Sequence, residues 1–172
     1  MLKRLVEDDI LAWKDRADRK PMVLMGARQV GKTWLMRDFG RKHFARVHEF
    51  NFDDTPDLAS VFEGTEDPAS ILARLAAISG ARIDIGRDVI IFDEIQECGN
   101  ALNSLKYFCE KCPQLAILAA GSLLGVKLRR KRGSSHELPQ TYPVGKVELL
   151  NVEPVSFSEF LRARNEPLWE YF

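Results

Sequence analysis

The chain lacks any apolar run of the roughly 18 residues that a membrane-spanning helix requires, so we expect no membrane association. It also lacks a charge excess: 25 basic residues balance 25 acidic ones, and global charge therefore favours no polyanionic partner. Internal repeats and low-complexity tracts are missing, and the first residues do not have the pattern of a secretory signal. With 45% hydrophobic and 29% charged residues, the composition is that of an ordinary globular protein, which we expect in the cytoplasm.

Cysteine is scarce, and the odd number of three residues without an export signal favours reduced thiols. Cys109 and Cys112 have the C-x-x-C spacing of a zinc knuckle or a redox pair, with Cys98 as a candidate third ligand. No second C-x-x-C and no histidine close in sequence accompanies them. We therefore favour the alternative, in which the thiols are partly buried around the end of a helix.

Short apolar runs alternate with amphipathic segments along the chain. The runs are too short for helices and are bounded by turn residues, which is typical of buried strands. We predict strands at Met22–Met25, Val47–Phe52, Val89–Phe92 and Leu115–Ala120. This alternation predicts an α/β fold in which a mostly parallel sheet is covered by helices on both faces.

Helix signals lie between and beyond these runs. The predicted helices cover residues 2–18, Lys32–His43, a segment from Pro68 that stops at Gly80, a segment capped by Asn100 that ends before Pro113, and a short segment after Ser156. Asp67 before Pro68 is a good N-cap, and Ser156 forms a capping box with Glu159. These signals support one helix before the first strand, one for each of the three gaps between strands and one more near the end of the sequence.

We divide the chain into an N-terminal helix (1–20), a core (21–165) and a final segment (166–172). The final segment is rich in large apolar side chains, which should not be exposed to water: Leu168, Trp169, Tyr171 and Phe172. We therefore expect either a fragment of a longer protein, whose lid or C-terminal region begins at residue 166, or a tail that docks on a partner.

The residues after the first predicted strand match the P-loop pattern G-x-x-x-x-G-K-[ST] in full. They are Gly26, Ala27, Arg28, Gln29, Val30, Gly31, Lys32 and Thr33. The glycines allow a concave nest of backbone N–H groups that point at phosphates, and the dipole of the following helix adds to this field. Lys32 is expected to reach the β- and γ-phosphates of ATP, and the Thr33 hydroxyl to ligate Mg²⁺.

Asp93 and Glu94 directly follow the apolar run Val89–Phe92. In P-loop proteins an aspartate at this place holds Mg²⁺, and an adjacent glutamate can act as the base toward the attacking water. The alternative is a strand-end aspartate followed by an ordinary loop residue. We predict Mg²⁺-dependent ATP hydrolysis, with Glu94 and Lys32 as catalytic residues and with Asp93 as a metal ligand beside Thr33.

Ser122 follows the predicted strand Leu115–Ala120 and is a third catalytic candidate. If that strand lies between the first strand and the strand that ends at Asp93, a small polar side chain there can position the attacking water. A serine that caps the next helix is an equally good interpretation of the residue.

Seven segments, spread from about Arg19 to Leu161, together carry a family resemblance. They are Gly26–Trp34, Phe50–Phe52, Phe92–Glu97, Leu105–Phe108, Ala120–Gly125, Pro143–Lys146 and Pro154–Leu161. In combination they resemble a prokaryotic family of AAA+ ATPases, the AAA domain 14 group, whose members usually continue into a C-terminal domain of unknown function.

The resemblance implies a three-layer P-loop NTPase sandwich with the sheet order 5-1-4-3-2. It also implies that Gly26–Thr33 is the Walker A motif, with Trp34 adjoining the nucleotide. Asp93 and Glu94 become the Walker B motif, and Ser122 takes the sensor-1 position. Longer members add a helical lid, and the sensor-2 arginine that such a lid often supplies has no candidate in this sequence.

Five of the six residues from Lys127 to Arg132 are basic. Arg129, Arg130 and Arg132 are candidates for an arginine finger that reaches a neighbouring subunit in a homo-oligomer. A contact with the phosphate backbone of nucleic acid, as in a DNA-associated ATPase, and a solvated loop remain alternatives. No aromatic residues interleave with the basic ones, so stacking on single-stranded nucleic acid has no support.

Three functional classes fit the motifs. The first is an ATPase whose hydrolysis is coupled to a conformational change of a C-terminal domain. The second is a P-loop kinase, against which the adjacent pair Asp93 and Glu94 argues. The third is a nucleotide-gated binding module, in which occupancy by ATP rather than turnover is the signal.

Overall fold

A five-stranded parallel sheet organises the part of the chain that the structure, a computed structural model, describes: residues 4–121, 143 and 145–164. The strands are β1 (Met22–Met25), β2 (Val47–Asn51), β3 (Val89–Asp93), β4 (Ala116–Ala120) and β5 (Glu148–Asn151). Their spatial order is β2-β3-β4-β1-β5, and every neighbouring pair is parallel. Read from the other edge, this order is 5-1-4-3-2, so the order implied by the family resemblance is confirmed.

Burial along the strands follows their place in the sheet. Every residue of β3 and β4 is buried, because helices cover both faces of these inner strands. β2 and β5 lie at the two edges, and burial alternates along each of them with the period of two that a strand imposes. The alternation of β5 explains why its residues were not predicted as a strand from an apolar run.

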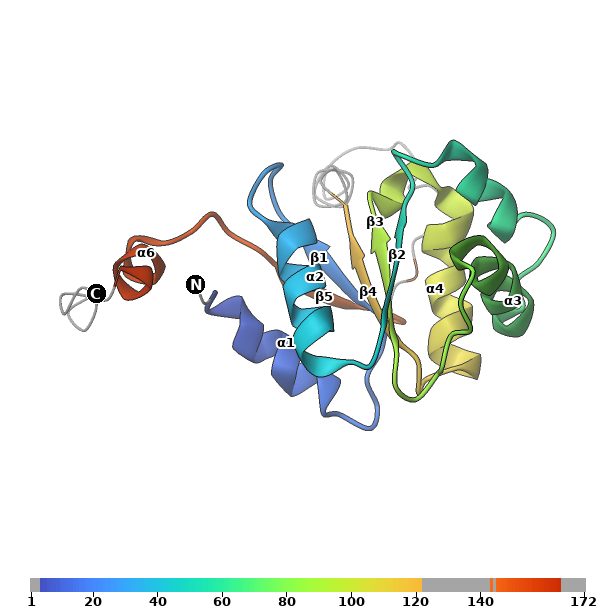
Figure 1. The fold of residues 1–172 in the computed structure, drawn as a ribbon, viewed down its shortest axis with the longest axis horizontal. Helices are drawn as coiled ribbons and strands as arrows, with labels where there is room; N and C mark the ends of the chain where they lie inside the picture. Colours follow the sequence, from blue (N-terminus) through green and yellow to red (C-terminus); the bar gives the residue numbers. More distant parts are fainter. Residues whose placement is uncertain (1–3, 122–142, 144, 165–172) are drawn as a thin grey trace.

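Helices cover the two faces of the sheet and create a three-layer sandwich (Figure 1). The helical elements are α1 (Val6–Lys14), α2 (Lys32–His43), η1 (Pro56–Phe62), α3 (Pro68–Ser79), η2 (Ile95–Glu97), α4 (Gly99–Lys111) and α6 (Phe157–Ala163). α1 and α2 pack on one face, whereas η1, α3 and α4 pack on the other. Among the described residues, no helix has the length and apolar character needed to cross a membrane.

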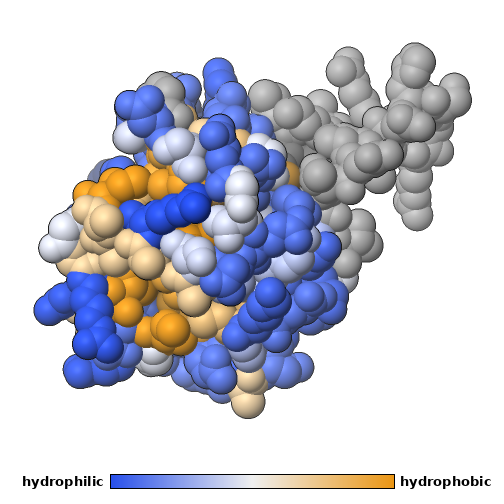
Figure 2. All heavy atoms as spheres, turned by 90° about the vertical axis from the view of Figure 1, so that its right-hand side faces the viewer, coloured by the Kyte–Doolittle hydropathy of each residue, from blue (hydrophilic) through white to orange (hydrophobic). Residues whose placement is uncertain are grey.

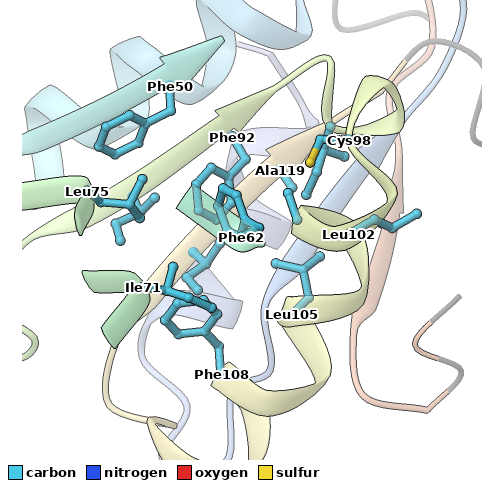
Figure 3. Packing of buried hydrophobic residues seen from close by; sticks show 14 of the residues in the cluster. Phe50, Phe62, Ile71, Leu75, Phe92, Cys98, Leu102, Leu105, Phe108 and Ala119 are labelled. Atoms are coloured by element: carbon cyan, nitrogen blue, oxygen red, sulfur yellow. The ribbon is translucent and has the colours of Figure 1, made fainter. Parts of the chain in front are cut away.

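The core on the α3 and α4 side is rich in phenylalanine (Figure 3). Phe92 of β3 lies at its centre, with ring centroids of Phe52 and Phe62 both 5.8 Å away and that of Phe50 6.1 Å away. Tilted and edge-on contacts at these distances are the arrangements that aromatic rings prefer. On the outer surface of this side, apolar patches are bordered by hydrophilic side chains (Figure 2).

Most of the predicted helix boundaries agree with the structure. α2 spans the predicted residues, and Asp67 Oδ2 caps α3 by accepting the Ser70 N–H at 3.0 Å. α3 ends at Gly80, whose φ of +65° is the left-handed conformation that favours glycine. The capping box also forms: Glu159 Oε2 accepts the Ser156 N–H at 2.7 Å, and Ser156 Oγ accepts the Glu159 N–H at 3.2 Å.

Two predicted helices and one segment between elements differ from the prediction. The first helix covers Val6–Lys14 rather than residues 2–18, and Arg4, just before it, is buried by contacts described below. α4 begins at Gly99 with Cys98 at the N-cap position, so the prediction that Asn100 caps this helix was wrong. The segment between β2 and α3, for which no element was predicted, contains the 3₁₀ helix η1, and its Leu58, Val61 and Phe62 are buried in the core.

Candidate functional site

The loop from Gly26 to Gly31 joins the end of β1 to the start of α2, at the carboxyl edge of the sheet. Gly26 has a φ of +145°, and a Cβ atom at this position would lie 2.2 Å from the carbonyl oxygen of Val152. Gly31 has a φ of +89° at the N-cap position of α2. Both positions therefore require glycine because of their backbone conformation. Gly26 is also required because the backbone of Val152, in a neighbouring segment, approaches it closely.

An open cavity of about 580 Å³ lies beside this loop. Its volume is within the range of small-molecule and cofactor sites. The lining residues come from the loop, from the first turns of α2, and from the segments after β2 and β3: Arg28, Gln29, Gly31, Lys32, Thr33, Trp34, Arg37, Asp53 and Glu94. Because α2 begins at this cavity, its N–H groups and the positive end of its dipole favour an anion there.

Lys32 is almost buried, with 7% of its surface exposed. Its ammonium donates hydrogen bonds to the carbonyl oxygens of Gly26 at 3.0 Å and Ala27 at 2.7 Å, which keeps it inside the curve of the loop. Burial lowers the pKa of Lys32, and the nearby charges of Glu94 and Asp93 oppose this shift. An anion bound in the loop would stabilise the charged form further, so the ammonium is suited to hold a phosphate oxygen.

Thr33 and Asp93 connect the loop to the end of β3. The Thr33 hydroxyl donates to Asp93 Oδ2 at 2.7 Å, and the Glu94 N–H donates to Asp93 Oδ1 at 3.1 Å. Burial raises the pKa of Asp93, although these two hydrogen bonds act in the opposite direction. A hydroxyl and a carboxylate are oxygen donors of the kind that Mg²⁺ prefers, so the pair fits a magnesium ion.

Glu94 lines the same cavity and is half-buried. Its backbone is left-handed, with φ +50° and ψ +42°, a conformation that costs a non-glycine residue of order 1–3 kcal/mol. The amide of Gln96 donates to Glu94 Oε2 at 2.5 Å. Sequence analysis assigned no role to Gln96, although it lies within one of the segments that carry the family resemblance.

Asp53 and Arg37 are two further residues of the cavity that sequence analysis missed. Asn51 stands opposite Asp93 in the register of β2 and β3, and its Oδ1 accepts the Asp53 N–H at 2.9 Å. Arg37 forms a bidentate ion pair with Glu49, whose oxygens accept from Arg37 Nε at 2.9 and 2.7 Å. The only sequence signal for these residues was their position beside a strand end or one turn into α2.

Most of the predicted site residues from the loop, from the start of α2 and from the end of β3 thus line one cavity. Asp93 does not line it but contacts Thr33, which does, and Gly26, Ala27 and Val30 of the loop do not line it either. Ala27 contributes its carbonyl oxygen to Lys32, and Val30 is buried in the core. β4 does lie between β1 and β3, as the Ser122 hypothesis requires. Ser122 itself lies outside the described residues, as do Arg129, Arg130 and Arg132.

The three cysteines are free thiols, and Cys98 and Cys112 are buried. Burial raises the pKa of both, which keeps them protonated. Within the described ranges, no group of three or more cysteine, histidine or acidic side chains is placed to hold a metal ion.

Comparisons with known proteins agree with this geometry. The family model AAA_14, described as an AAA domain, matches residues 18–161. The Walker-type ATPase PABY2304 of Pyrococcus abyssi has a similar structure, with a TM-score of 0.59 and 17% sequence identity. The match covers 99% of this chain and 59% of the Pyrococcus chain, so this chain spans less than two thirds of its neighbour's length. No curated protein matches the sequence. Together the family and the fold support nucleotide binding and ATPase chemistry in general.

Proposed function

The chain belongs to the AAA_14 family of AAA domains, and from its site geometry we propose that it binds ATP with Mg²⁺ and hydrolyses it. The hydrogen bond between Thr33 and Asp93 is the observation that carries the proposal. It joins the phosphate-binding loop to the end of β3 and so places Glu94 and Lys32 around the same cavity. A phosphate held by the loop would therefore share the cavity with the carboxylate of Glu94, which can accept a proton.

The proposed mechanism assigns the residues of the site to phosphate binding, metal binding and activation of water. The loop N–H groups and Lys32 hold the β- and γ-phosphates, and Thr33 and Asp93 hold Mg²⁺. The metal ion, when bound, neutralises charge on the phosphate oxygens. Glu94 accepts the proton of the attacking water, and Trp34, 42% exposed at the cavity, adjoins the nucleotide. Ser122 is proposed to position the water from the end of β4.

Phosphate release tests hydrolysis most directly. Glu94→Gln should lower kcat by about 10²- to 10⁴-fold, because it removes the general base while keeping the shape of the side chain. Its affinity for ATP should remain unchanged. Glu97→Gln is the matched control, because Glu97 is an exposed neighbour that also accepts from Gln96, at 3.2 Å. Equal loss of turnover in both variants, or in neither, would contradict the assignment of Glu94.

ATP affinity tests the phosphate site. Lys32→Ala should weaken binding by roughly 10- to 100-fold, the value of one lost charged hydrogen bond. Lys42→Ala is the control on the same helix, because Lys42 pairs with Asp38 far from the loop. Undiminished affinity in Lys32→Ala would overturn the phosphate site.

A nucleotide-gated binding module is the second candidate function. The observation that favours it is the 2.5 Å contact between Gln96 and Glu94, which engages one oxygen of the proposed base. Tight Mg²⁺-dependent ATP binding without phosphate release would support this function. Phosphate release that Glu94→Gln abolishes would exclude it.

We also propose that hydrolysis drives a movement of a C-terminal region, as the family resemblance implies, and that a homo-oligomer completes the site. In an oligomer, Arg129, Arg130 or Arg132 is proposed to reach the γ-phosphate of a neighbouring subunit. Turnover per subunit should then rise with protein concentration. A constant turnover across that series would exclude the arginine finger.

A further inference from the structure

Arg4 is a charged residue that lies buried behind the phosphate-binding loop, with 3% of its surface exposed. Its Nη1 donates a hydrogen bond to the carbonyl oxygen of Val30 at 3.0 Å. A Cβ atom at Gly31 would lie 3.7 Å from the same nitrogen. The guanidinium therefore supports the part of the loop that leads directly into Lys32, and it does not itself line the cavity.

Glu159 of α6 supplies the counter-charge, although it is 155 positions away in sequence. Its Oε1 lies 3.1 Å from Arg4 Nε, and both side chains are 4% exposed. The Leu5 N–H donates to the same oxygen at 2.8 Å, while the Ser156 N–H donates to Oε2. Burial opposes ionisation of Glu159, but these hydrogen bonds outweigh it and lower the pKa of the carboxyl. The pair is thus ionised and held by several hydrogen bonds, the condition under which a buried ion pair is tolerated.

The segment between β5 and α6 makes two more contacts with this region. Arg4 Nη2 donates to the carbonyl oxygen of Glu153 at 2.5 Å. The Val152 N–H donates to the Met25 carbonyl at 2.7 Å, just before the loop begins. In Figure 1 the start of α1 and α6 accordingly lie near each other, on the side of the sheet away from α3 and α4.

Each of the three guanidinium nitrogens of Arg4 therefore has an acceptor. Nε donates to the Glu159 carboxylate, Nη1 to the Val30 carbonyl and Nη2 to the Glu153 carbonyl. A residue that only anchored the N-terminus would need Glu159 alone. The bond to Val30 adds the loop to this network, and Arg4 Nη1 can keep the Val30 carbonyl as its acceptor only while the loop holds its present shape. Removal of the guanidinium would leave Glu159 as a buried charge without its partner.

We propose that Arg4 is a positioning residue of the nucleotide site, which holds the loop in its phosphate-binding shape and links it to α6. The inference rests on the proposed function, because it concerns the same loop. Binding free energies are reciprocal: if an ordered α6 strengthens ATP binding through Arg4, then ATP stabilises the docking of α6 by the same factor. Through Arg4 and Glu159, the stability of α6 docking therefore depends on whether ATP occupies the loop.

ATP affinity of the Arg4→Met variant is the first test. The variant should bind Mg-ATP roughly 10-fold more weakly, within the usual range of coupling between sites, with a rise in KM that exceeds the change in kcat. Arg4→Lys, which keeps the charge but loses the planar fork, should give an intermediate affinity. Unchanged affinity in Arg4→Met would overturn the inference.

Arg16→Met is the matched control. Arg16 also joins the N-terminal part of the chain to the C-terminal part, since its Nη1 and Nη2 donate to Glu148 at 2.9 and 2.7 Å. This pair is exposed and has no contact with the loop. Arg16→Met should therefore leave ATP affinity unchanged. An equal loss in both variants would show that Arg4 acts only through general stability, and would overturn the inference.

Hydrogen exchange of the unmodified chain gives a test that needs no variant to fold. Mg-ATP should slow the exchange of the Glu159 and Phe160 amides, which donate to Ser156 at the start of α6. Protection of the loop amides without protection of α6 would overturn the coupling while leaving ATP binding intact. If neither region is protected, the proposed function itself fails, and the inference fails with it.

Discussion

Asp88 directly precedes strand β3 and Asp93 is its last residue; both are almost fully buried, yet the pKa of one carboxyl is lowered and that of the other is raised. Burial opposes ionisation of Asp88, but hydrogen bonds from the Asp84 N–H at 2.8 Å and from His48 outweigh it and lower the pKa of Asp88. His48 Nε2 lies 3.0 Å from Asp88 Oδ2. Asp93 has a raised pKa, because burial outweighs its two hydrogen bonds and the charges of Glu94 and Glu49 add to it.

The difference separates a carboxylate whose partners compensate for its burial from one whose partners do not. At the amino end of β3, the protein supplies enough partners to stabilise the ionised form of Asp88. At the carboxyl end, burial disfavours the ionised form of Asp93, and a bound cation would favour it, as is common for groups placed for binding or catalysis. The contrast therefore supports the proposed magnesium site independently of the sequence motif.

Replacement of Asp93 should have the largest effect. Asp93→Asn should lower Mg²⁺-dependent phosphate release by about 10²- to 10³-fold, the usual loss for one electrostatic contact in an active site. The free energy of unfolding without nucleotide should not fall, because the variant removes a poorly compensated buried charge. Asp54→Asn is the control, since Asp54 is exposed and does not line the cavity. A clear loss of stability in Asp93→Asn would contradict the conclusion that the charge of Asp93 is less well compensated than that of Asp88.

Replacement of Asp88 should affect stability instead of turnover. Asp88→Asn should lower the free energy of unfolding by about 1–3 kcal/mol, because a buried, hydrogen-bonded charge beside His48 is lost. Urea unfolding measures this loss, and ATP affinity should stay at the value of the unmodified protein. Weaker ATP binding in Asp88→Asn would show that the two ends of β3 are not independent.

The pH dependence of stability should show the smallest effect, but with opposite signs at the two ends. Asp88 binds its proton less tightly in the folded state, so its contribution to stability is present above the ordinary carboxyl pKa of about 3.9 and is lost as pH falls below it. Asp93 binds its proton more tightly when folded, so its contribution decreases as pH rises above that value.

Urea unfolding of each asparagine variant and of the unmodified protein, between about pH 3 and pH 7, isolates these contributions. The free energy of unfolding of the unmodified protein minus that of the variant should increase with pH for Asp88→Asn. For Asp93→Asn the same difference should decrease with pH or become negative. Curves with the same slope would remove the distinction between the two carboxylates.

Local signals explain what could be predicted. The glycines, Lys32 and Thr33 form a contiguous motif, and α2 begins and ends where its own residues indicate. The buried strand β3 was evident from Val89–Phe92, because a short apolar run between turn residues has few other interpretations. The confirmed sheet order, in contrast, came from the family resemblance, since spacing along a chain does not determine which strands become neighbours.

By itself, then, the sequence determined the strands of the core, the helix that follows the loop, and the chemistry of the loop, because these depend on residues within a few positions of one another. Only the tertiary structure decided that Thr33 contacts Asp93, that Gln96 holds Glu94, and that Arg4 pairs with Glu159 behind the loop. Such contacts bury charge or polar groups between distant segments, and their stability depends on the partners that the folded chain brings together. No local pattern contains that information.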